Sequence, residues 1–599
     1  MSTDSSSISD TNQLVDSGTK REWRITPHDA PLVEQLIRTT GLPPVVAQLL
    51  VSRGVYSQED AATFLDTKLT SLRDPQLLPG VPAATEKILA AAEAKTPIVI
   101  YGDYDADGMT GSAILVNCLR LIGAEVSYHV PNRLEEGYGL NEDSIRKLVA
   151  RGKQMIISVD CGIASLQCAK LCRELGVTLI VTDHHQIGDE LPDADIIVHP
   201  RLPGTAYPFG ELCGAGVAFK LAWSLCQAKC GQKKVTPPMK RFLMQSLSLA
   251  AIGTIADVVP LLDENRVLVN HGLRVMQNEP LPGLWELMKL TKLDQASELT
   301  TENISFGLAP RLNAAGRLGQ AQLGIELLTI EAGDRAVALA QYIDQLNGTR
   351  DTLQRSVQLA AQKQAKADFD PENDPALVLA GVGWHTGVIG VVAGRLAEKY
   401  AKPVIILSLD TAGKVDATGS GRVGGTGINL YEALRECEDR LVRYGGHPAA
   451  GGLTIRESDI EAFRGDFCEA VSKQWSEQEL APAIQIDAEA PLGQLNLQTM
   501  KQIETMAPFG AGNPRPVLMG RDIQLNEPAK KMGKGENHLS VRLKQGERVI
   551  RGVAFGAADW CEPLNQHNGP IEIAYRPVIN EFNGYRSVEV HLVDWRKQA

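Results

Sequence analysis

Residues 97–108 read PIVIYGDYDADG, an apolar run of strand length that stops at an acidic turn. Three similar apolar runs follow, at residues 154–160, 177–183 and 194–198. Stretches with helical spacing, for example residues 112–122, lie between them. Short buried strands that alternate with helices form right-handed βαβ units, so the chain is predicted to contain an α/β domain built on a parallel sheet.

The first three runs each lead into acidic side chains. These side chains and the imidazoles that follow the third run are Asp103, Asp105, Asp107, Asp160, Asp183, His184 and His185. Asp257 stands in another apolar stretch, AAIGTIADVVPL. Because ligand sites of parallel sheets lie beyond the carboxyl ends of the strands, these groups are expected to share one cluster. Carboxylates with one or two imidazoles suit Mn²⁺ or Mg²⁺ better than a structural zinc ion, and a paired-ion site is predicted.

Each part of this cluster also has a simpler interpretation. The acidic triplet alone fits a solvated loop, and Asp257 alone fits a helix N-cap or a satisfied core group. A calcium loop would need a glutamate at its twelfth position, where this chain has Ile114. Burying several unpaired carboxylates is costly, which favours a shared metal centre.

The composition limits the class of protein. A chain of 599 residues is long enough for about four domains. It carries 60 Lys and Arg against 72 Asp and Glu, a net charge of −12, which argues against a protein that coats nucleic acid through bulk charge. No stretch is long and apolar enough for a membrane span. Residues 1–20, rich in Ser, Asp and Thr, are expected to be a disordered tail rather than a signal peptide, and a cytoplasmic location is expected.

The ten cysteines contain no CxxC pair. Cys168 and Cys172, and likewise Cys226 and Cys230, are four residues apart, so a four-thiolate zinc site is conceivable. Both pairs lie in helix-like stretches that lack the Gly or Pro turn of a zinc knuckle. Reduced thiols in a cytosolic protein are therefore the favoured interpretation.

The rest of the chain predicts three further parts. Residues 335–366 have no proline and one glycine, and their apolar residues recur at helical spacing with Arg350 in the one gap. This pattern predicts a long amphipathic helix that bridges two lobes. A smaller α/β lobe follows, with strands near residues 376–380 and 403–407. From about residue 484, short alternating runs and hairpin signals predict a small antiparallel barrel or sandwich.

Four of the stretches above, YGDYDADGMTG, SVDCGI, VTDHH and IGTIADVVPL, resemble in this order the motifs of the DHH phosphoesterase superfamily. VPNRLEEGYGL, PRLNAAGRLG, WHTGVIGVVAGRL, GSGR and YGGHPAAGG are similar to its bacterial exonucleases for single-stranded DNA. The resemblance covers the chain from about residue 40 to the end. It implies a metal-dependent 5′→3′ exonuclease that hydrolyses single-stranded DNA to mononucleotides in recombination and repair.

The resemblance also implies a division of the chain. The expected parts are an N-terminal helical segment at residues 21–85, a DHH catalytic domain at 86–320, the bridging helix at 321–370, a DHHA1 domain at 371–480 and an OB-fold-like single-strand-binding domain at 481–599. The expected partners are single-stranded DNA, a single-strand-binding protein and a helicase. A monomer without membrane contact is expected.

Individual roles follow from the same resemblance. The implied ligands of two Mn²⁺ or Mg²⁺ ions are Asp105, Asp107, Asp160, His184 and Asp257, and the implied catalytic groups are Asp160, His184, His185 and His447. Asp160 is expected to bridge the ions. Asp103 and Asp183 are expected to orient the ligands. Some relatives carry a histidine four residues before the first ligand, where this chain has Tyr101, so the ligand set of the first ion stays open.

A second set of residues is implied to hold phosphates. The expected 5′-phosphate and DNA-binding residues are Arg133, Arg311, Asn313, Arg317, Ser420, Arg422, Gly445 and Gly446. Surface loops and glycine turns are the alternative for them. Residues 521–599 contain 12 Lys and Arg and 10 Asp and Glu, a small positive excess. Candidate contacts of that barrel with single strands are Lys530, Lys531, Lys534, Tyr575, Phe582 and Tyr585. Tyr575, on the apolar face of its run, is expected in the barrel core instead.

Two other functions are disfavoured. DHH hydrolases of short oligonucleotides, cyclic dinucleotides or pyrophosphate are generally smaller and lack a third domain. A non-catalytic DNA-binding scaffold would not need the implied metal ligands, all of which are present.

Overall fold

The computed structural model of the chain describes residues 21–133, 136–137, 139–370, 373–475, 483–582 and 585–598. These residues form two compact units. The larger unit holds the described residues of 68–479 with residues 510–512, and the smaller unit holds those of the two ends. The predicted tail at residues 1–20 lies outside the described residues.

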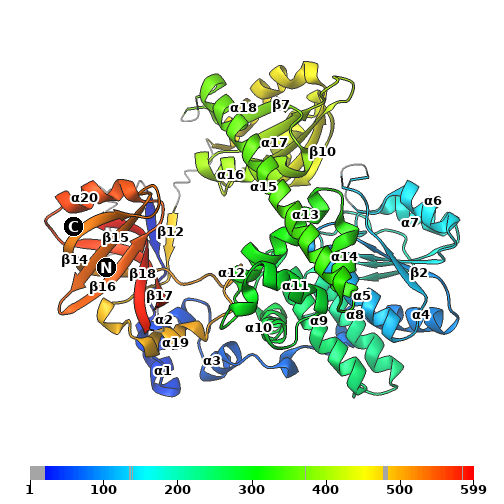
Figure 1. Cartoon of the computed structure of the whole chain (residues 1–599), viewed down its shortest axis with the longest axis horizontal. Coiled ribbons are helices and arrows are strands. Elements are labelled where there is room, and N and C mark those ends of the chain that lie inside the picture. The colour runs from blue at the N-terminus through cyan, green and yellow to red at the C-terminus, as the bar shows by residue number, and fades with distance from the viewer. Residues whose placement is uncertain are drawn as a thin grey trace, which may run out of the picture. The chain divides into compact units, whose positions relative to one another are not determined.

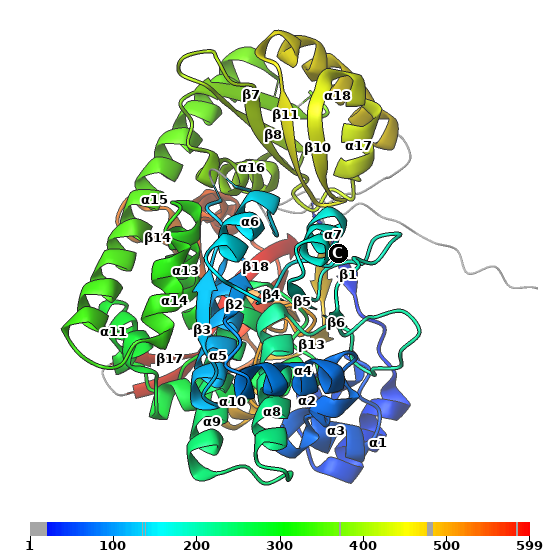
Figure 2. The ribbon, with the colours of Figure 1, turned by 90° about the vertical axis from the view of Figure 1, so that its right-hand side faces the viewer.

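The larger unit contains a parallel sheet of five strands in the order β3-β2-β4-β5-β6, as the alternating pattern predicted. Figure 1 labels β2 of this sheet, and Figure 2 labels all five strands. The strands are β2 (Ile98–Gly102), β3 (Val126–His129), β4 (Met155–Val159), β5 (Thr178–Thr182) and β6 (Ile196–Val198). Neighbouring strands pair in register, for example Ile98 with Met155 and Met155 with Thr178. Alternate side chains therefore face opposite sides of the sheet.

Helices cover both faces of this sheet (Figure 2). Ile98, Ile100 and Ile157 pack into a core with α4 (Val81–Glu93), α5 (Ala106–Leu121) and α8 (Gly214–Lys229). Val99, Ile156 and Val181 pack on the opposite face with α6 (Glu142–Ala150) and α7 (Leu166–Glu174). Burial on both faces explains why these strands read as continuous apolar runs.

A helical layer extends the first core. Its helices are α9 (Pro237–Ala256), α10 (Asp263–Asn278), α11 (Pro282–Leu290), α12 (Thr301–Asn303), the π-helix η4 (Ile304–Leu308), α13 (Ala309–Arg317) and α14 (Ala321–Thr329). The predicted bridging helix is α15 (Asp334–Asp368). Leu339 and Ile343 in its first half belong to the first core, whereas Val357 and Ala361 in its second half pack with the following lobe.

That lobe contains a mixed sheet in the order β10-β11-β9-β8-β7. Its strands are β7 (Leu377–Val382), β8 (Val404–Leu409), β9 (Ala417–Arg422), β10 (Leu441–His447) and β11 (Ala450–Ile455), and only β7 and β8 are parallel. One face packs on α15 and α16 (Thr386–Tyr400), and the other on α17 (Leu430–Glu436) and α18 (Ile460–Trp475).

The smaller unit contains a closed five-stranded barrel, as predicted for an OB-like domain. Its strands are β14 (Leu518–Met532), β15 (His538–Gln545), β16 (Arg548–Ala554), β17 (Ile571–Phe582) and β18 (Tyr585–Lys597). The ring closes because β14 pairs with both β15 and β17, and β18 pairs with both β16 and β17. The helix α20 (Cys561–Gln566) lies between β16 and β17 in the chain, and β13 (Ala488–Glu489) adds to β14.

The N-terminal residues differ from the helical segment expected at residues 21–85. Three helices, α1 (Ala30–Thr40), α2 (Pro44–Val51) and α3 (Gln58–Leu65), share the barrel core with α19 (Leu497–Glu504). They are preceded by a strand, β1 (Glu22–Ile25), which pairs in parallel with β12 (Ala483–Ile486). The strand β1 has four residues, and only Trp23 among them is buried. Its sequence therefore shows no alternation of apolar and polar residues that could have predicted a strand. The helix α4 belongs to the larger unit instead.

The cysteines are free thiols, and none takes part in a candidate metal cluster of the described residues. The helices that the structure describes include none that is both long and apolar enough to cross a membrane.

Candidate metal centre

The acidic residues meet at one edge of the parallel sheet. Asp103, Asp160 and Asp183 are each the first residue after β2, β4 and β5, which are neighbours in the sheet. Asp257 reaches the same place from the C-terminal end of α9. The sequence predicted this convergence, because the carboxyl ends of parallel strands share one edge.

Three overlapping groups of side chains lie close enough to hold metal ions. They are Asp160 with His184 and His185, Asp107 with His184 and Asp257, and Asp103 with Asp105 and Asp160. Within each group the ligand atoms lie within 4.8 Å of one another. The five implied ligands are thus brought together, along with His185 and Asp103. Asp183 belongs to none of these groups of described residues.

The first turn of α5 fixes Asp105 and Asp107. Asp105 is the N-cap of α5, and its Oδ1 accepts hydrogen bonds from the backbone N–H of Asp107 at 2.9 Å and of Gly108 at 3.0 Å. The carboxylate of Asp107 accepts hydrogen bonds from the N–H of Gly214 at 2.6 Å and of Ala215 at 2.9 Å. These last donors open α8, so a helix N-terminus holds Asp107 in place.

His184 faces the carboxylates. Its Nε2 lies 3.1 Å from Asp160 Oδ1, 3.5 Å from Asp257 Oδ2 and 3.9 Å from Asp107 Oδ2. His185 is turned differently, because its Nδ1 is hydrogen bonded to Asp183 Oδ1 at 2.8 Å. Asp183 in turn accepts a hydrogen bond from the N–H of Ile163 at 2.9 Å. Asp183 therefore orients His185, whereas its expected role of orienting the metal ligands stays a prediction.

The electrostatics of the cluster favour a cation. Burial and then the neighbouring Asp107 and Asp105 raise the pKa of Asp160 well above its usual value. Burial, reinforced by neighbouring carboxylates, also raises the pKa of Asp257 to about 8. Burial lowers the pKa of His184 to about 4. Burial alone would lower the pKa of His185, but its hydrogen bond to the charged Asp183 outweighs burial and raises that pKa to about 9.

The donor set fits a divalent ion. Among the described residues, the buried atoms Asp103 Oδ1 and His184 Nε2 have no hydrogen-bond partner. A buried polar atom without a partner is costly, and a metal ion would satisfy both. Oxygen ligands with imidazole nitrogen match Mn²⁺ or Mg²⁺.

The residues expected to bind phosphate fall into three situations. Arg311 already pairs with Asp344 at 2.7 Å, and its Nη1 donates to the carbonyl of Gly307. It joins α13 to α15. Gly445 and Gly446 lie in β10. His447, which was expected to be catalytic, lies in the same strand, is exposed and belongs to none of the three ligand groups of described residues. A Cβ on Gly446 would lie 2.4 Å from the carbonyl oxygen of Ala450, so the hairpin itself requires that glycine.

The other arginines lie near Arg317. Burial and the nearby Arg133, Arg350 and Arg422 lower the pKa of Arg317 to about 10. The guanidinium of Arg133 lies over the ring of Tyr104, 4.8 Å from its centroid. Arg422 Nη1 donates to Ser420 Oγ at 3.1 Å. Arg350 was not assigned to DNA from the sequence, although its place in the apolar stripe of α15 was a usable signal.

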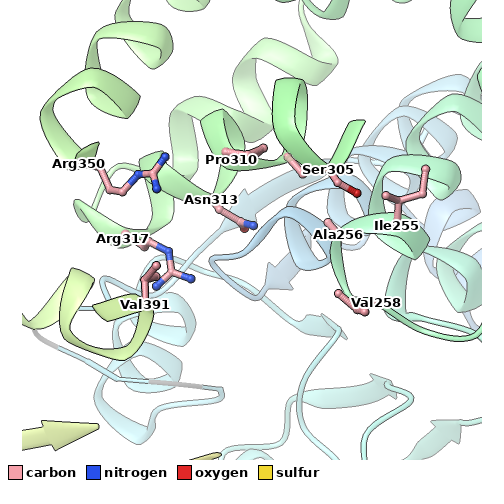
Figure 3. Close-up of a pocket in the computed structure, with 10 residues that line it drawn as sticks. Ile255, Ala256, Val258, Ser305, Pro310, Asn313, Arg317, Arg350 and Val391 are labelled. Atoms are coloured by element: carbon pink, nitrogen blue, oxygen red, sulfur yellow. The ribbon is translucent and has the colours of Figure 1, made fainter. Parts of the chain in front are cut away.

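A pocket of about 230 Å³ adjoins the cluster (Figure 3). Its lining includes Val258, the residue after Asp257, and Asn313, whose Oδ1 accepts a hydrogen bond from the N–H of Ala106 in α5. Figure 3 shows the guanidinium groups of Arg317 and Arg350 on one side and Ile255 and Val258 on the other. Apolar walls with two cations are typical of a site for an anionic ligand.

The barrel has exposed basic and aromatic side chains of its own. Lys530 and Lys531 at the end of β14 and Lys534 in the next turn are exposed, and Tyr585 is 82% exposed. Tyr575 is buried, and its hydroxyl donates to the carbonyl of Ala490, so it belongs to the core as expected. The side chain of Phe582 lies outside the described residues.

The sequence reasoning missed Phe555, which is 62% exposed and packs edge-on against His538 and His591.

Three family models match this chain. They are the DHH family N-terminal domain at residues 97–254, the DHHA1 domain at 373–473 and the RecJ OB domain at 486–594. The chain is also similar to solved structures of RecJ from Thermus thermophilus. The complex with Mn²⁺ is 30% identical and has a TM-score of 0.80 over 96% of this chain and 80% of that one. The complex with Mg²⁺ is 29% identical, with a TM-score of 0.73 over 96% and 79%.

Curated relatives extend the similarity in sequence. The single-stranded-DNA-specific exonuclease RecJ of Bacillus subtilis is 36% identical over 96% of this chain and 71% of its own length. The protein of that name from Salmonella typhimurium is 34% identical over 92% of this chain and 96% of its own. Since these relatives and all three domain models agree along the chain, it belongs to the RecJ family of single-stranded-DNA-specific exonucleases.

Proposed function

We propose that this chain is a metal-dependent exonuclease that degrades single-stranded DNA from its 5′ end to mononucleotides in recombination and repair. The observation that carries the proposal is the buried cluster of carboxylates and His184 at the strand ends, in a chain whose relatives bear the name of this activity. Mn²⁺ or Mg²⁺ is the cofactor that the donor set and the metal-bound relatives support.

The ligands that we propose for two ions are Asp105, Asp107, Asp160, His184 and Asp257. Asp160 and His184 each belong to two of the three ligand groups, which supports a position between the ions. When bound, a pair of divalent ions activates water and stabilises charge on the attacking and leaving oxygens of a phosphodiester.

The chain's own groups position the substrate around that centre. Asp183 holds His185 in one orientation through the hydrogen bond to Nδ1, and His185 so held is placed to contact a phosphate oxygen. Arg133, Ser420 and Arg422 hold the terminal 5′-phosphate, because an arginine fork binds a terminal phosphate bidentately. Arg317 lies near Arg133 and Arg422, and we propose that it holds a backbone phosphate of the strand rather than the terminal one.

The proposed parts of the chain are those expected from the sequence. They are a DHH catalytic domain at residues 86–320, a bridging segment at 321–370 whose long helix is α15, a DHHA1 domain at 371–480 and a single-strand-binding domain at 481–599. The segment expected at residues 21–85 is instead divided between the two units. We further propose that the chain acts as a cytoplasmic monomer with a single-strand-binding protein and a helicase. The matched RecJ OB domain supports a long single strand as substrate over the small substrates of other DHH hydrolases.

One assay tests the function. Purified protein is incubated with a single strand labelled at its 5′ end, or with the matching blunt duplex, in the presence of Mn²⁺ or EDTA. Release of the label as a mononucleotide from the single strand, in Mn²⁺ alone, is expected. Release from the duplex at an equal rate, or of oligonucleotides only, would contradict the proposal.

A further inference from the structure

We propose that Arg350 and the pocket beside the metal centre hold a backbone phosphate of the DNA on the 3′ side of the cleaved bond. The inference rests on the proposed function, from which it takes the strand and its direction. It gives a role to Arg350, a charged residue among the buried positions of α15, which the function described above leaves unused.

The first support is the way in which α15 holds Arg350. Its Nη2 donates to Asn347 Oδ1 at 2.5 Å, and its Nη1 donates to Gln354 Oε1 at 3.0 Å. Both amides are on the same helix and are 9% and 1% exposed. Neutral amides fix the direction of a guanidinium without cancelling its charge. Asp351 Oδ1 lies 3.2 Å from Nη2, but its side chain is 41% exposed, so water screens this pair.

The second support is the chemistry of the pocket. The described residues that line it include Arg317 and Arg350 and no acidic residue, with Val258 and Pro310 among its apolar walls (Figure 3). A water molecule takes about 30 Å³ of liquid, so a pocket of about 230 Å³ has room for a phosphodiester with part of its sugar. Two cations facing an apolar wall match a phosphate and the apolar face of a deoxyribose.

The direction of the strand decides which phosphate this is. An enzyme that removes one nucleotide at a time from the 5′ end has a single nucleotide on the 5′ side of the cleaved bond. The phosphate of that nucleotide is assigned to Arg133, Ser420 and Arg422, none of which is among the described residues that line the pocket. A further phosphate in the pocket therefore belongs to a nucleotide on the 3′ side.

Substrates of two and three nucleotides test this assignment. A 5′-phosphorylated dinucleotide has only the terminal phosphate and the cleaved linkage, whereas a trinucleotide has one phosphate more. Arg350→Gln should lower kcat/KM for the trinucleotide about ten- to hundredfold, the usual range for one charge-assisted contact. Its kcat/KM for the dinucleotide should stay within about twofold of the unsubstituted protein. Arg355→Gln, at an exposed arginine of the same helix, should change neither value.

A neutral linkage gives an independent measurement. A methylphosphonate at the second linkage of the trinucleotide should slow the unsubstituted protein at least as much as Arg350→Gln does, because Arg317 also loses its charged partner. The same methylphosphonate should slow Arg350→Gln by a smaller factor. Equal losses on dinucleotide and trinucleotide, or full additivity of the two changes, would overturn the inference. Failure of the unsubstituted protein to release mononucleotides from any single strand would instead overturn the proposed function.

Discussion

Asp160 combines an unusual backbone with a central position in the cluster. Its φ of 63° lies in the left-handed region, which costs an L-residue about 1–2 kcal/mol. A Cβ on Gly214 would lie 2.6 Å from the Asp160 carboxylate, so the start of α8 packs directly on it. Strain and close packing at one carboxylate are typical of a site that is fixed before its ligand binds.

Metal-dependent stability should rise with pH. The folded, metal-free protein holds the pKa of Asp257 at about 8, above that of an unfolded aspartate, and raises that of Asp160 as well. The folded state then binds more protons than the unfolded state, so its stability falls as pH rises toward 8. Metal ions relieve this penalty and displace protons. The increase in Tm caused by Mn²⁺ should therefore be larger at pH 8 than at pH 6.

Thermal melting with Mn²⁺ or EDTA at both pH values checks this expectation. Asp160→Ala should abolish most of the increase in Tm that Mn²⁺ causes. It should also lower the rate of hydrolysis by more than about 100-fold, because losing a residue that only supports a metal ligand typically costs up to about that factor. Asp439→Ala, at an exposed carboxylate of the same unit, is the control. An increase in Tm that is equal at the two pH values would count against the buried carboxylates as the ligands.

Arg422 should control recognition of the strand terminus. Arg422→Ala should raise KM for 5′-phosphorylated strands about ten- to hundredfold, because it removes a charge-assisted contact. The kcat at saturating strand should change less. Steady-state kinetics on 5′-phosphorylated and 5′-hydroxyl strands measure the preference. An unchanged preference would remove Arg422 from the 5′-phosphate site.

Single residues show where sequence reasoning succeeds. Asp103, Asp160 and Asp183 were placed correctly because strand ends in a parallel sheet share one edge. That Arg311 binds phosphate stays a prediction, but its ion pair with Asp344, 33 residues away, was not foreseen. Such pairing depends on how α13 meets α15, which no local pattern encodes.

Helix packing behind the cluster depends on Gly253 in α9. A Cβ there would lie 2.3 Å from Asp107 Oδ1 and 2.6 Å from the Cβ of Ala215 in α8. Gly253→Ala should therefore push α9 away, destabilise the larger unit by about 1–3 kcal/mol and reduce hydrolysis. Gly465→Ala, in α18 with no described atom within 4 Å of the new Cβ, should be neutral or stabilising by up to about 1 kcal/mol. Melting curves and activity of both variants distinguish the two cases, and equal behaviour would contradict this packing argument.

Long elements were predictable and short pairings were not. The apolar stripe of α15 repeats over many turns, so its prediction at residues 335–366 agrees with Asp334–Asp368. The strand β1 has four residues and pairs with β12, about 460 residues further along the chain. A strand of that length has no period to detect, and its partner is set only by the folded unit.

The smaller unit is expected to strengthen the binding of long single strands and to leave the hydrolysis of very short ones unchanged. Phe555, directly after β16, is an exposed ring that packs on His538, the partner of Met532 at the basic end of β14. Tyr585, at the start of β18, is a second exposed ring of the barrel. Replacing both with alanine should weaken binding of a long single strand by about 1–3 kcal/mol for each stacked base. Hydrolysis of a dinucleotide should not change, because it is too short to reach a second site. Tyr56→Ala, at an exposed tyrosine of the same unit, is the control.

Fluorescence anisotropy with a labelled strand, beside dinucleotide kinetics, measures both effects. Equal affinity of the double variant and the control for the long strand would show that these rings do not bind bases. Equal losses on long and short substrates would show that the substitutions act through the catalytic unit.

The location of the metal ions is the most direct test of the whole account. Crystals soaked in Mn²⁺ and measured near the manganese absorption edge reveal the ions by anomalous scattering. Two peaks are predicted among Asp105, Asp107, Asp160, His184 and Asp257, with Asp160 in contact with both. Absence of any peak there, from crystals of protein whose hydrolysis of single strands requires Mn²⁺, would contradict the account.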